Sequence, residues 1–181
     1  MLGCSSILKG GEIMLRKDLE KIKQVKEEAL KDWFPRKTQM AKDFIDEESK
    51  QQKRNFDIGA VHLCELGVNI GSEQGEERPV VILSNNRINS SSTNVMIVPL
   101  TKNLKKRRIK TKKGIIKNAP KIRTHYFLMK DKYPFLSYNS AAMTEGITTI
   151  SKIRIGKHMG KLSDQDLTAI QSRLKWIFDL Q

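Results

Sequence analysis

The sequence predicts an α+β protein: a small antiparallel β-barrel that follows a helical N-terminal segment and is closed by a C-terminal helix. Three observations support this class. Apolar residues recur at helical spacing before residue 55, short strand-like runs separated by turn residues follow, and a capped helix ends the sequence. One sheet-based core with helices at its ends can bury such patterns within 181 residues.

The helical segment spans residues 14–54. No glycine or proline interrupts it before Pro35, and a second helical stretch begins at Met40. The apolar positions of the first stretch are Leu15, Leu19, Ile22, Ala29 and Leu30. Because this apolar face is thin, we expect the helices to need a surface to pack on. We therefore divide the chain into a largely helical extension, residues 1–55, and a second domain, residues 56–181.

Strand-like runs begin after Phe56. Residues 58–66 alternate polar and apolar side chains, and the continuous apolar run at 79–83 predicts a central strand buried on both faces. The polar stretch 89–94 is expected to be a loop. Further strands are expected at residues 95–100, 124–128 and 140–143. Short strands of this kind suggest a small barrel.

The final helix has a defined start. Ser163 at the N-cap and Asp166 three residues later fit a capping box. One face of the helix then carries Leu167, Ile170, Leu174, Ile177 and Phe178. We expect this face to pack on the barrel.

Charge is concentrated in one segment. The formal net charge is +14, and the stretch Thr101–Lys130 carries 12 lysines and arginines with no acidic residue. Such a polarised distribution favours a polyanionic partner, because lysine and arginine that neutralise phosphates release condensed counterions. The alternative is a solvated loop kept soluble by its charge.

The composition excludes a membrane protein. Charged residues make up 30% of the chain, and no apolar run approaches the roughly 18 residues that a spanning helix needs. The first residues lack the features of a secretory signal, and Cys4 and Cys64 have no metal-ligand spacing. We therefore expect a cytoplasmic protein with free thiols that binds no metal or cofactor.

Several motifs resemble the MazF/PemK family of toxins. The run from Asn69 to Ile82, Asn-Ile-Gly-Ser-Glu-Gln-Gly-Glu-Glu-Arg-Pro-Val-Val-Ile, is similar to the family's first strand–loop–strand signature. Segments 98–101, 144–152 and 160–164 follow in the family's order, and the resemblance covers roughly residues 56–180. It implies a homodimer of small SH3-like barrels, in the plasmid-maintenance fold shared with CcdB. It also implies an RNA channel across the interface and an acidic antitoxin as partner.

The resemblance further implies a metal-independent endoribonuclease that cleaves single-stranded mRNA at short sequences. The 2′-hydroxyl would attack the adjacent phosphorus, giving a 2′,3′-cyclic phosphate and a 5′-hydroxyl. Two other readings stay open: a gyrase-poisoning toxin of the same fold, and a catalytically inactive RNA-binding or interaction protein.

Arg78 is the expected centre of this chemistry. A guanidinium offers two fixed donors to the charge that develops on the phosphorane oxygens, and it stays protonated. We therefore expect Arg78 to stabilise charge, with proton transfer through water or Glu73. The alternative is a structural salt bridge from Arg78 to Glu76 or Glu77.

Other site residues follow from the family's pattern. Thr101 is expected to hold a phosphate oxygen, and the loop residues Glu73 and Gln74 are expected to act as base and as reader of base edges, respectively. The remaining expected RNA contacts are Asn85, Lys102, Lys105, Lys106, Arg107, Arg108, Glu145, Thr149 and Lys152. Family members often have Gln-Ile-Arg-Thr where this chain has Gly-Ile-Thr-Thr at 146–149, which should alter base selection rather than chemistry.

Overall fold

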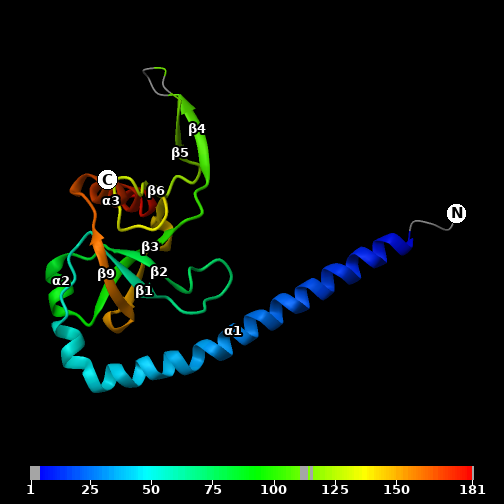
Figure 1. The fold of residues 1–181 in the computed structure, drawn as a ribbon, viewed down its shortest axis with the longest axis horizontal. Coiled ribbons are helices and arrows are strands. Elements are labelled where there is room, and N and C mark those ends of the chain that lie inside the picture. Colours follow the sequence, from blue (N-terminus) through cyan, green and yellow to red (C-terminus); the bar gives the residue numbers. More distant parts are fainter. Residues whose placement is uncertain (1–4, 111–113, 115, 181) are drawn as a thin grey trace. The chain divides into compact units, whose positions relative to one another are not determined.

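The computed structural model describes residues 5–110, 114 and 116–180 (Figure 1). The chain divides into two compact units, Met1–Lys42 and Asp43–Gln181. None of the helices in these described ranges is both long and apolar enough to cross a membrane.

The N-terminal helix α1 spans Ser5–Lys53 and continues through Pro35. Two separate helices were expected, so this prediction was wrong at the proline. One proline removes a single backbone hydrogen bond, and strong helix formers on both sides carry the helix across it. The backbone instead leaves helical geometry at Glu47 (φ −117°, ψ 17°).

Within the described part of the second unit, seven strands form one antiparallel sheet. Its order is β6-β7-β3-β2-β1-β9, and β8 also pairs with β3. The strands are β1 (Ala60–Glu65), β2 (Glu77–Ile82), β3 (Asn94–Thr101), β6 (His125–Leu128), β7 (Ser140–Met143), β8 (Thr148–Ser151) and β9 (Ile155–Lys161). The first half of β3 pairs with β8 and its end pairs with β7, so β3 connects the two parts of the sheet. The predicted α+β class is confirmed.

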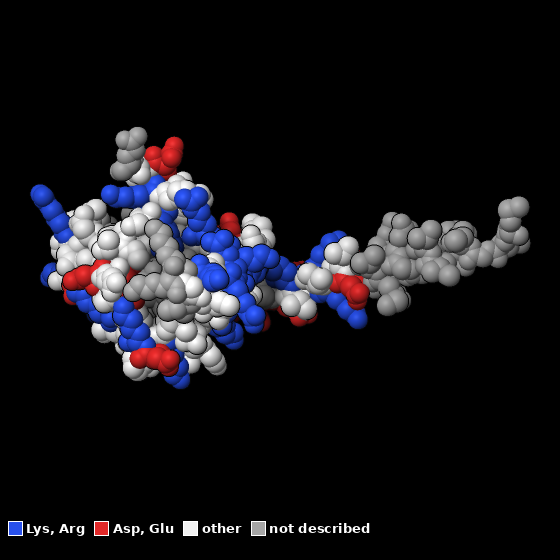
Figure 2. Space-filling view, turned by 90° about the horizontal axis from the view of Figure 1, so that it is seen from above, with Lys and Arg blue, Asp and Glu red and all other residues white. Residues whose placement is uncertain are grey.

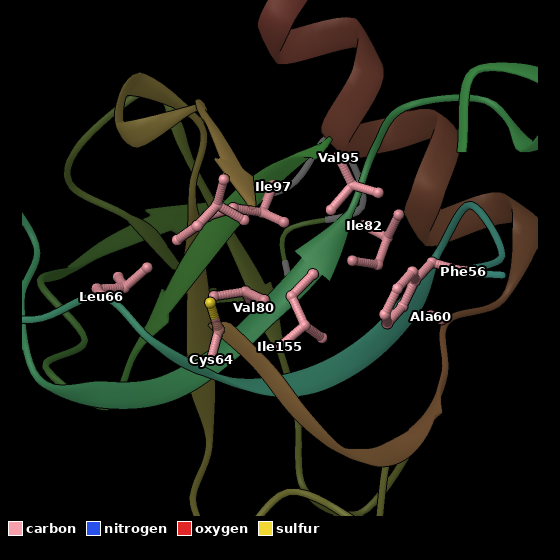
Figure 3. Close-up of a cluster of buried hydrophobic side chains, with 10 residues drawn as sticks. Phe56, Ala60, Cys64, Leu66, Val80, Ile82, Val95, Ile97 and Ile155 are labelled. Atoms are coloured by element: carbon pink, nitrogen blue, oxygen red, sulfur yellow. The ribbon is translucent and has the colours of Figure 1, made fainter. Parts of the chain in front are cut away.

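Alternation along the central strands fills two separate cores. Val80 and Ile82 belong to one cluster, which Figure 3 shows, whereas Val81 belongs to the other. The continuous apolar run at 79–83 is therefore buried on both faces, as predicted. Helix α3 (Asp164–Ile177) covers the second core with Ile170.

Two local predictions were wrong. Part of the expected loop at 89–94 belongs to a short helix, α2 (Asn86–Ser91), in which Asn89 is buried and donates to Phe56 O at 2.6 Å. Phe178, expected on the packed face of α3, is exposed because the helix ends at Ile177. The predicted N-cap is confirmed, since Ser163 accepts a hydrogen bond from Asp166 N–H.

The end of α1 is anchored to the sheet. Arg54 donates to Lys152 O and to Ile155 O, each at 2.7 Å. In return, Lys152 Nζ donates to Gln52 O at 2.9 Å. Burial and the neighbouring Arg54 charge lower the pKa of Lys152. Residues just before β1 are therefore part of the fold of the sheet domain.

Candidate active site

A polar cleft of about 900 Å³ lies in the second unit. It is bounded by the loop between β1 and β2, the end of β3, the start of β6 and the segment from β7 to β8. The predicted site residues that line it are Glu73, Gln74, Thr101, Lys105, Glu145 and Thr149. Folding thus brings together segments that are far apart in the sequence.

The loop between β1 and β2 is closed by its own backbone. Glu76 N–H donates to Gly67 O at 2.6 Å, and Leu66 N–H donates to Glu76 O at 2.9 Å. A Cβ on residue 75 would lie 2.6 Å from Gly67 O, so only glycine fits there. This close approach fixes the chain where it enters β2, next to Arg78.

Arg78 is held by the loop rather than by an acid. Its Nε donates to Gly75 O at 2.7 Å, and its Nη1 donates to Gln74 Oε1. Among the described residues it forms no ion pair, so the alternative bridge to Glu76 or Glu77 is not present. The half-buried guanidinium therefore keeps donor capacity for an anionic ligand.

Gln74 has its side-chain amide engaged at both ends. Its Oε1 accepts from Arg78, and its Nε2 donates to Ser72 O at 3.2 Å. The expected base reader thus orients the arginine in this structure. Glu73 is exposed, and its Oε2 accepts from Ile70 N–H at 3.2 Å.

Thr101 lies at the end of β3, where the chain turns. Its Oγ1 accepts a hydrogen bond from Asn103 N–H at 3.1 Å. A hydroxyl that accepts one bond still has a hydrogen to donate. Thr101 can therefore donate to an oxygen of a ligand in the cleft.

His125 is a cleft residue that no motif in the sequence singles out. Its ring is buried, and its Nε2 lies 2.8 Å from Glu145 Oε1. Burial raises the pKa of Glu145, but hydrogen bonds from the Thr124 hydroxyl, its own backbone and His125 bring it below the ordinary value. The pairing of β6 with β7, which places His125 opposite Met143, could not be read from local periodicity.

A basic hairpin projects next to the cleft, formed by β4 (Lys106–Lys110) and β5 (Ile116–Pro120) (Figure 1). Lys106, Arg107 and Arg108 are exposed on it, and Lys105 lines the cleft at its base. Figure 2 shows lysine and arginine gathered around this part of the surface. Lys102 lies outside the cleft lining, with Nζ 5.5 Å from the centre of the Tyr138 ring. Residues 111–113 and 115 of the predicted insert lie outside the described residues.

Two residues predicted to contact RNA have structural roles. Lys152 is 0% exposed, so the expectation that it lines the channel was wrong: its ammonium is used to hold the end of α1. Asn85 caps α2 by accepting from Ile88 N–H at 2.9 Å, and it is not among the residues that line the cleft.

Metal-binding and thiol chemistry find no support in the described part of the chain. It holds no group of three or more His, Cys, Asp or Glu side chains placed to bind a metal ion. Burial raises the pKa of the Cys64 thiol to about 12, so this thiol is unreactive at neutral pH.

The fold and the cleft define a small β-sheet domain whose arginine, hydroxyl and basic hairpin suit an anionic ligand. A profile of the family described as "PemK-like, MazF-like toxin of type II toxin-antitoxin system" matches residues 57–178. The chain therefore belongs to this family of type II toxins.

Individual relatives agree with this membership. An endoribonuclease MazF from Staphylococcus saprophyticus is 32% identical over 116 residues, covering 64% of this chain and 85% of the relative. The crystal structure of MazF from Deinococcus radiodurans superposes with a TM-score of 0.55 at 15% identity, covering 70% of this chain and 99% of that one. Toxin MazF-mt6 of Mycobacterium tuberculosis gives 0.50 at 19% identity, covering 67% and 98%. At these identities the two structures support the fold alone.

Proposed function

We propose that this toxin is a metal-independent endoribonuclease that cleaves single-stranded mRNA in the cytoplasm at a short recognition sequence. The relative from Staphylococcus saprophyticus is named as an endoribonuclease, which supports the same reaction here. The observation that carries the proposal is an arginine held next to a cleft residue. Arg78 does not itself line the cleft, but it is fixed by Gly75 O and by Oε1 of the cleft-lining Gln74, and no carboxylate neutralises it within the described chain.

The proposed reaction gives each group one role. The RNA 2′-hydroxyl attacks the adjacent phosphorus, and its oxygen displaces the 5′-oxygen of the next nucleotide. Arg78 donates to the phosphorane oxygens, where negative charge develops, and the Thr101 hydroxyl holds one of them. The proton of the 2′-hydroxyl passes to Glu73 or to water, and water protonates the leaving 5′-oxygen. The products are a 2′,3′-cyclic phosphate and a 5′-hydroxyl.

The other cleft residues bind the substrate. Thr149 and Glu145 also line the cleft, and in this proposal they contact the nucleotides next to the cut, with Glu145 oriented by His125. The basic hairpin binds phosphates outside the cleft, which strengthens binding without selecting sequence. The functional unit is a homodimer, as the family resemblance implies.

A cognate antitoxin completes the system. One structural relative is a MazE–MazF complex from Deinococcus radiodurans, with a TM-score of 0.50 at 12% identity. For this chain we expect an acidic partner, encoded beside it, whose disordered segment orders over the cleft and the hairpin.

One assay separates the three functions considered. Purified protein is incubated in EDTA with a long synthetic single-stranded RNA, and the new 3′ ends are identified by mass spectrometry. Cleavage to cyclic phosphate ends that Arg78→Ala abolishes supports the ribonuclease. RNA binding without cleavage indicates an inactive binding module, and inhibition of gyrase supercoiling with intact RNA indicates a gyrase poison.

A further inference from the structure

The apolar side chains of α1 in the first unit are exposed. Leu19, Ile22, Val25 and Leu30 expose between 45% (Leu30) and 66% (Val25) of their surface. They lie before residues 57–178, which the toxin family matches, so the ribonuclease fold does not account for them. Isolated helices gain most of their stability by packing an apolar face. This apolar face of α1 can therefore pack against a partner.

The spacing of the face is that of a two-stranded coiled coil. With Leu19 at heptad position a, Ile22 and Ala29 occupy d, and Lys26 and Trp33 occupy the next a positions. Arg36 occupies the last d position of residues 18–37, so the sequence places apolar residues at four of the six seam positions in this segment. A single lysine at a lowers stability but specifies register and oligomeric state, which argues for one defined pairing over a general apolar contact.

The charges beside the apolar face indicate which helix packs against it. In a parallel, in-register pair, each g residue faces the e residue five positions later on the other helix. The three facing pairs would be Asp18–Lys23, Val25–Leu30 and Asp32–Lys37. Each pair joins opposite charges or two apolar side chains. An antiparallel pair would place g against g and e against e, so that aspartates face aspartates and lysines face lysines.

We propose that residues 18–37 of α1 form a parallel two-stranded coiled coil with the same segment of a second copy of this chain. The pairing covers the exposed apolar side chains of both copies and sets Lys26 against Lys26. Lys23 already pairs with Glu20 of its own helix at 2.6 Å, but both side chains are at least 65% exposed. Such a surface pair is weak, so Lys23 can also serve the interhelical contact.

Cysteine cross-linking in the full-length chain tests the proposal. Cys4 is replaced by serine, whereas Cys64 stays because it is buried and unreactive. Single cysteines are then placed at two seam positions, Leu19→Cys and Lys26→Cys, and at the outward position f as Gln24→Cys. Disulfide-linked dimer is followed on non-reducing gels in a glutathione buffer, and circular dichroism checks that each variant is folded.

Both seam variants should cross-link at least about tenfold faster than Gln24→Cys, because pairing raises the effective concentration of the facing thiols. Positions 19 and 26 lie about 10 Å apart along the helix, at about 1.5 Å per residue. Only a parallel, in-register pair links each of them to itself. Equal rates at all three positions, or cross-linking at only one seam position, would overturn the proposal.

A charge-reversal arm tests the partner. Lys23→Glu with Lys37→Glu should slow cross-linking through Lys26→Cys, and mixing this variant with an Asp18→Lys, Asp32→Lys variant should restore it as a heterodimer. No recovery on mixing would contradict the pairing. RNA cleavage is measured on the same samples, so failure of the coiled coil and failure of the proposed ribonuclease are separate results.

Discussion

Gln74 Oε1 accepts a hydrogen bond from Arg78 Nη1, so the cleft-lining glutamine and the arginine at the start of β2 form one unit. Because the other end of the same amide donates to Ser72 O, Gln74 transmits the conformation of the loop to the guanidinium. A residue expected to read bases is thus placed to position Arg78, the group that we propose stabilises the transition state.

Gln74→Ala should lower kcat about 10- to 100-fold on all RNA sequences alike, since small errors in placing a catalytic group are costly. Steady-state cleavage of several RNA sequences is the measurement. Ser72→Ala is the matched control, because it alters the same loop but keeps the backbone carbonyl that Gln74 contacts. A Gln74→Ala variant that keeps its rate and changes its preferred sequence would instead make Gln74 a base reader.

Arg78→Ala and Thr101→Ala should each reduce cleavage by about 100- to 1,000-fold, the usual cost of losing a donor to a developing oxyanion. Arg78→Lys should recover little activity, because a point charge cannot make the two-pronged contact. Single-turnover rates and growth arrest in cells report the loss. Arg87→Ala, an exposed arginine on α2, is the control. A fully active Arg78→Ala protein would contradict the proposed mechanism.

Replacing Lys105, Lys106, Arg107 and Arg108 with glutamine should weaken RNA binding equally for all sequences. The slope of log K against log salt should become shallower by up to about 0.7 per lost contact with single-stranded RNA. Fluorescence anisotropy at several salt concentrations measures this slope. Lys157→Gln is the control. If the slope of the four-glutamine variant is no different from that of this control and of the wild-type protein, the hairpin is a solvated loop.

The antitoxin should inhibit cleavage through charge. A purified complex with the product of the adjacent gene is expected to be inactive, and an acidic segment of the partner should protect the hairpin and the cleft from hydrogen exchange. The four-glutamine hairpin variant should bind this partner more weakly, because it offers less positive charge. A neighbouring protein that binds tightly yet leaves RNA cleavage intact would contradict this model of inhibition.

Asp166 should make stability depend on pH. Burial raises its pKa, but hydrogen bonds from Tyr133 (2.6 Å), Lys132 (2.9 Å) and Tyr126 (2.9 Å) bring it below the ordinary value. The unfolded state then binds protons more tightly than the native state. The stabilisation is therefore complete above the unfolded pKa of about 4 and is lost as pH falls through the native pKa.

Asp166→Asn should destabilise the protein by about 1–3 kcal/mol at pH 7, the range for a damaged buried hydrogen-bond network. The difference from the wild-type protein should shrink when urea denaturation is repeated near pH 3. Asp164→Asn is the control, because Asp164 lies in the same helical turn but is exposed. An Asp166→Asn loss that stays constant down to pH 3 would show that the carboxylate charge is not involved.

Local patterns predicted the elements whose burial is regular. The run at 79–83 and the Ser163 cap could be predicted because one-residue alternation and the spacing from cap to N3 are properties of short segments. The short helix α2 was missed because a buried side chain, Asn89, holds it in place through Phe56. A tertiary contact therefore stabilises a helix in a segment whose polar residues predicted a loop.

The candidate site also has features that local sequence predicts and features that depend on tertiary contacts. The motif around Arg78 could be identified in sequence, but its hydrogen bond to Gln74 depends on a loop closed by Gly75. His125 could not be found because only the pairing of β6 with β7 brings it to Glu145. Lys152 was misplaced because a lysine in a matching motif is expected at the surface, whereas here the end of α1 buries it.

The buried Lys152 has a consequence for how this chain could change over evolutionary time. Its ammonium donates to Gln52 O, which lies before the segment shared with the toxin family, and Arg54 returns two hydrogen bonds to the same strand connection. A deletion that removed the extension up to residue 56 would expose these groups in one step. The end of α1 is therefore hard to lose: a chain shortened to residue 56 must also replace the lysine that Gln52 satisfies.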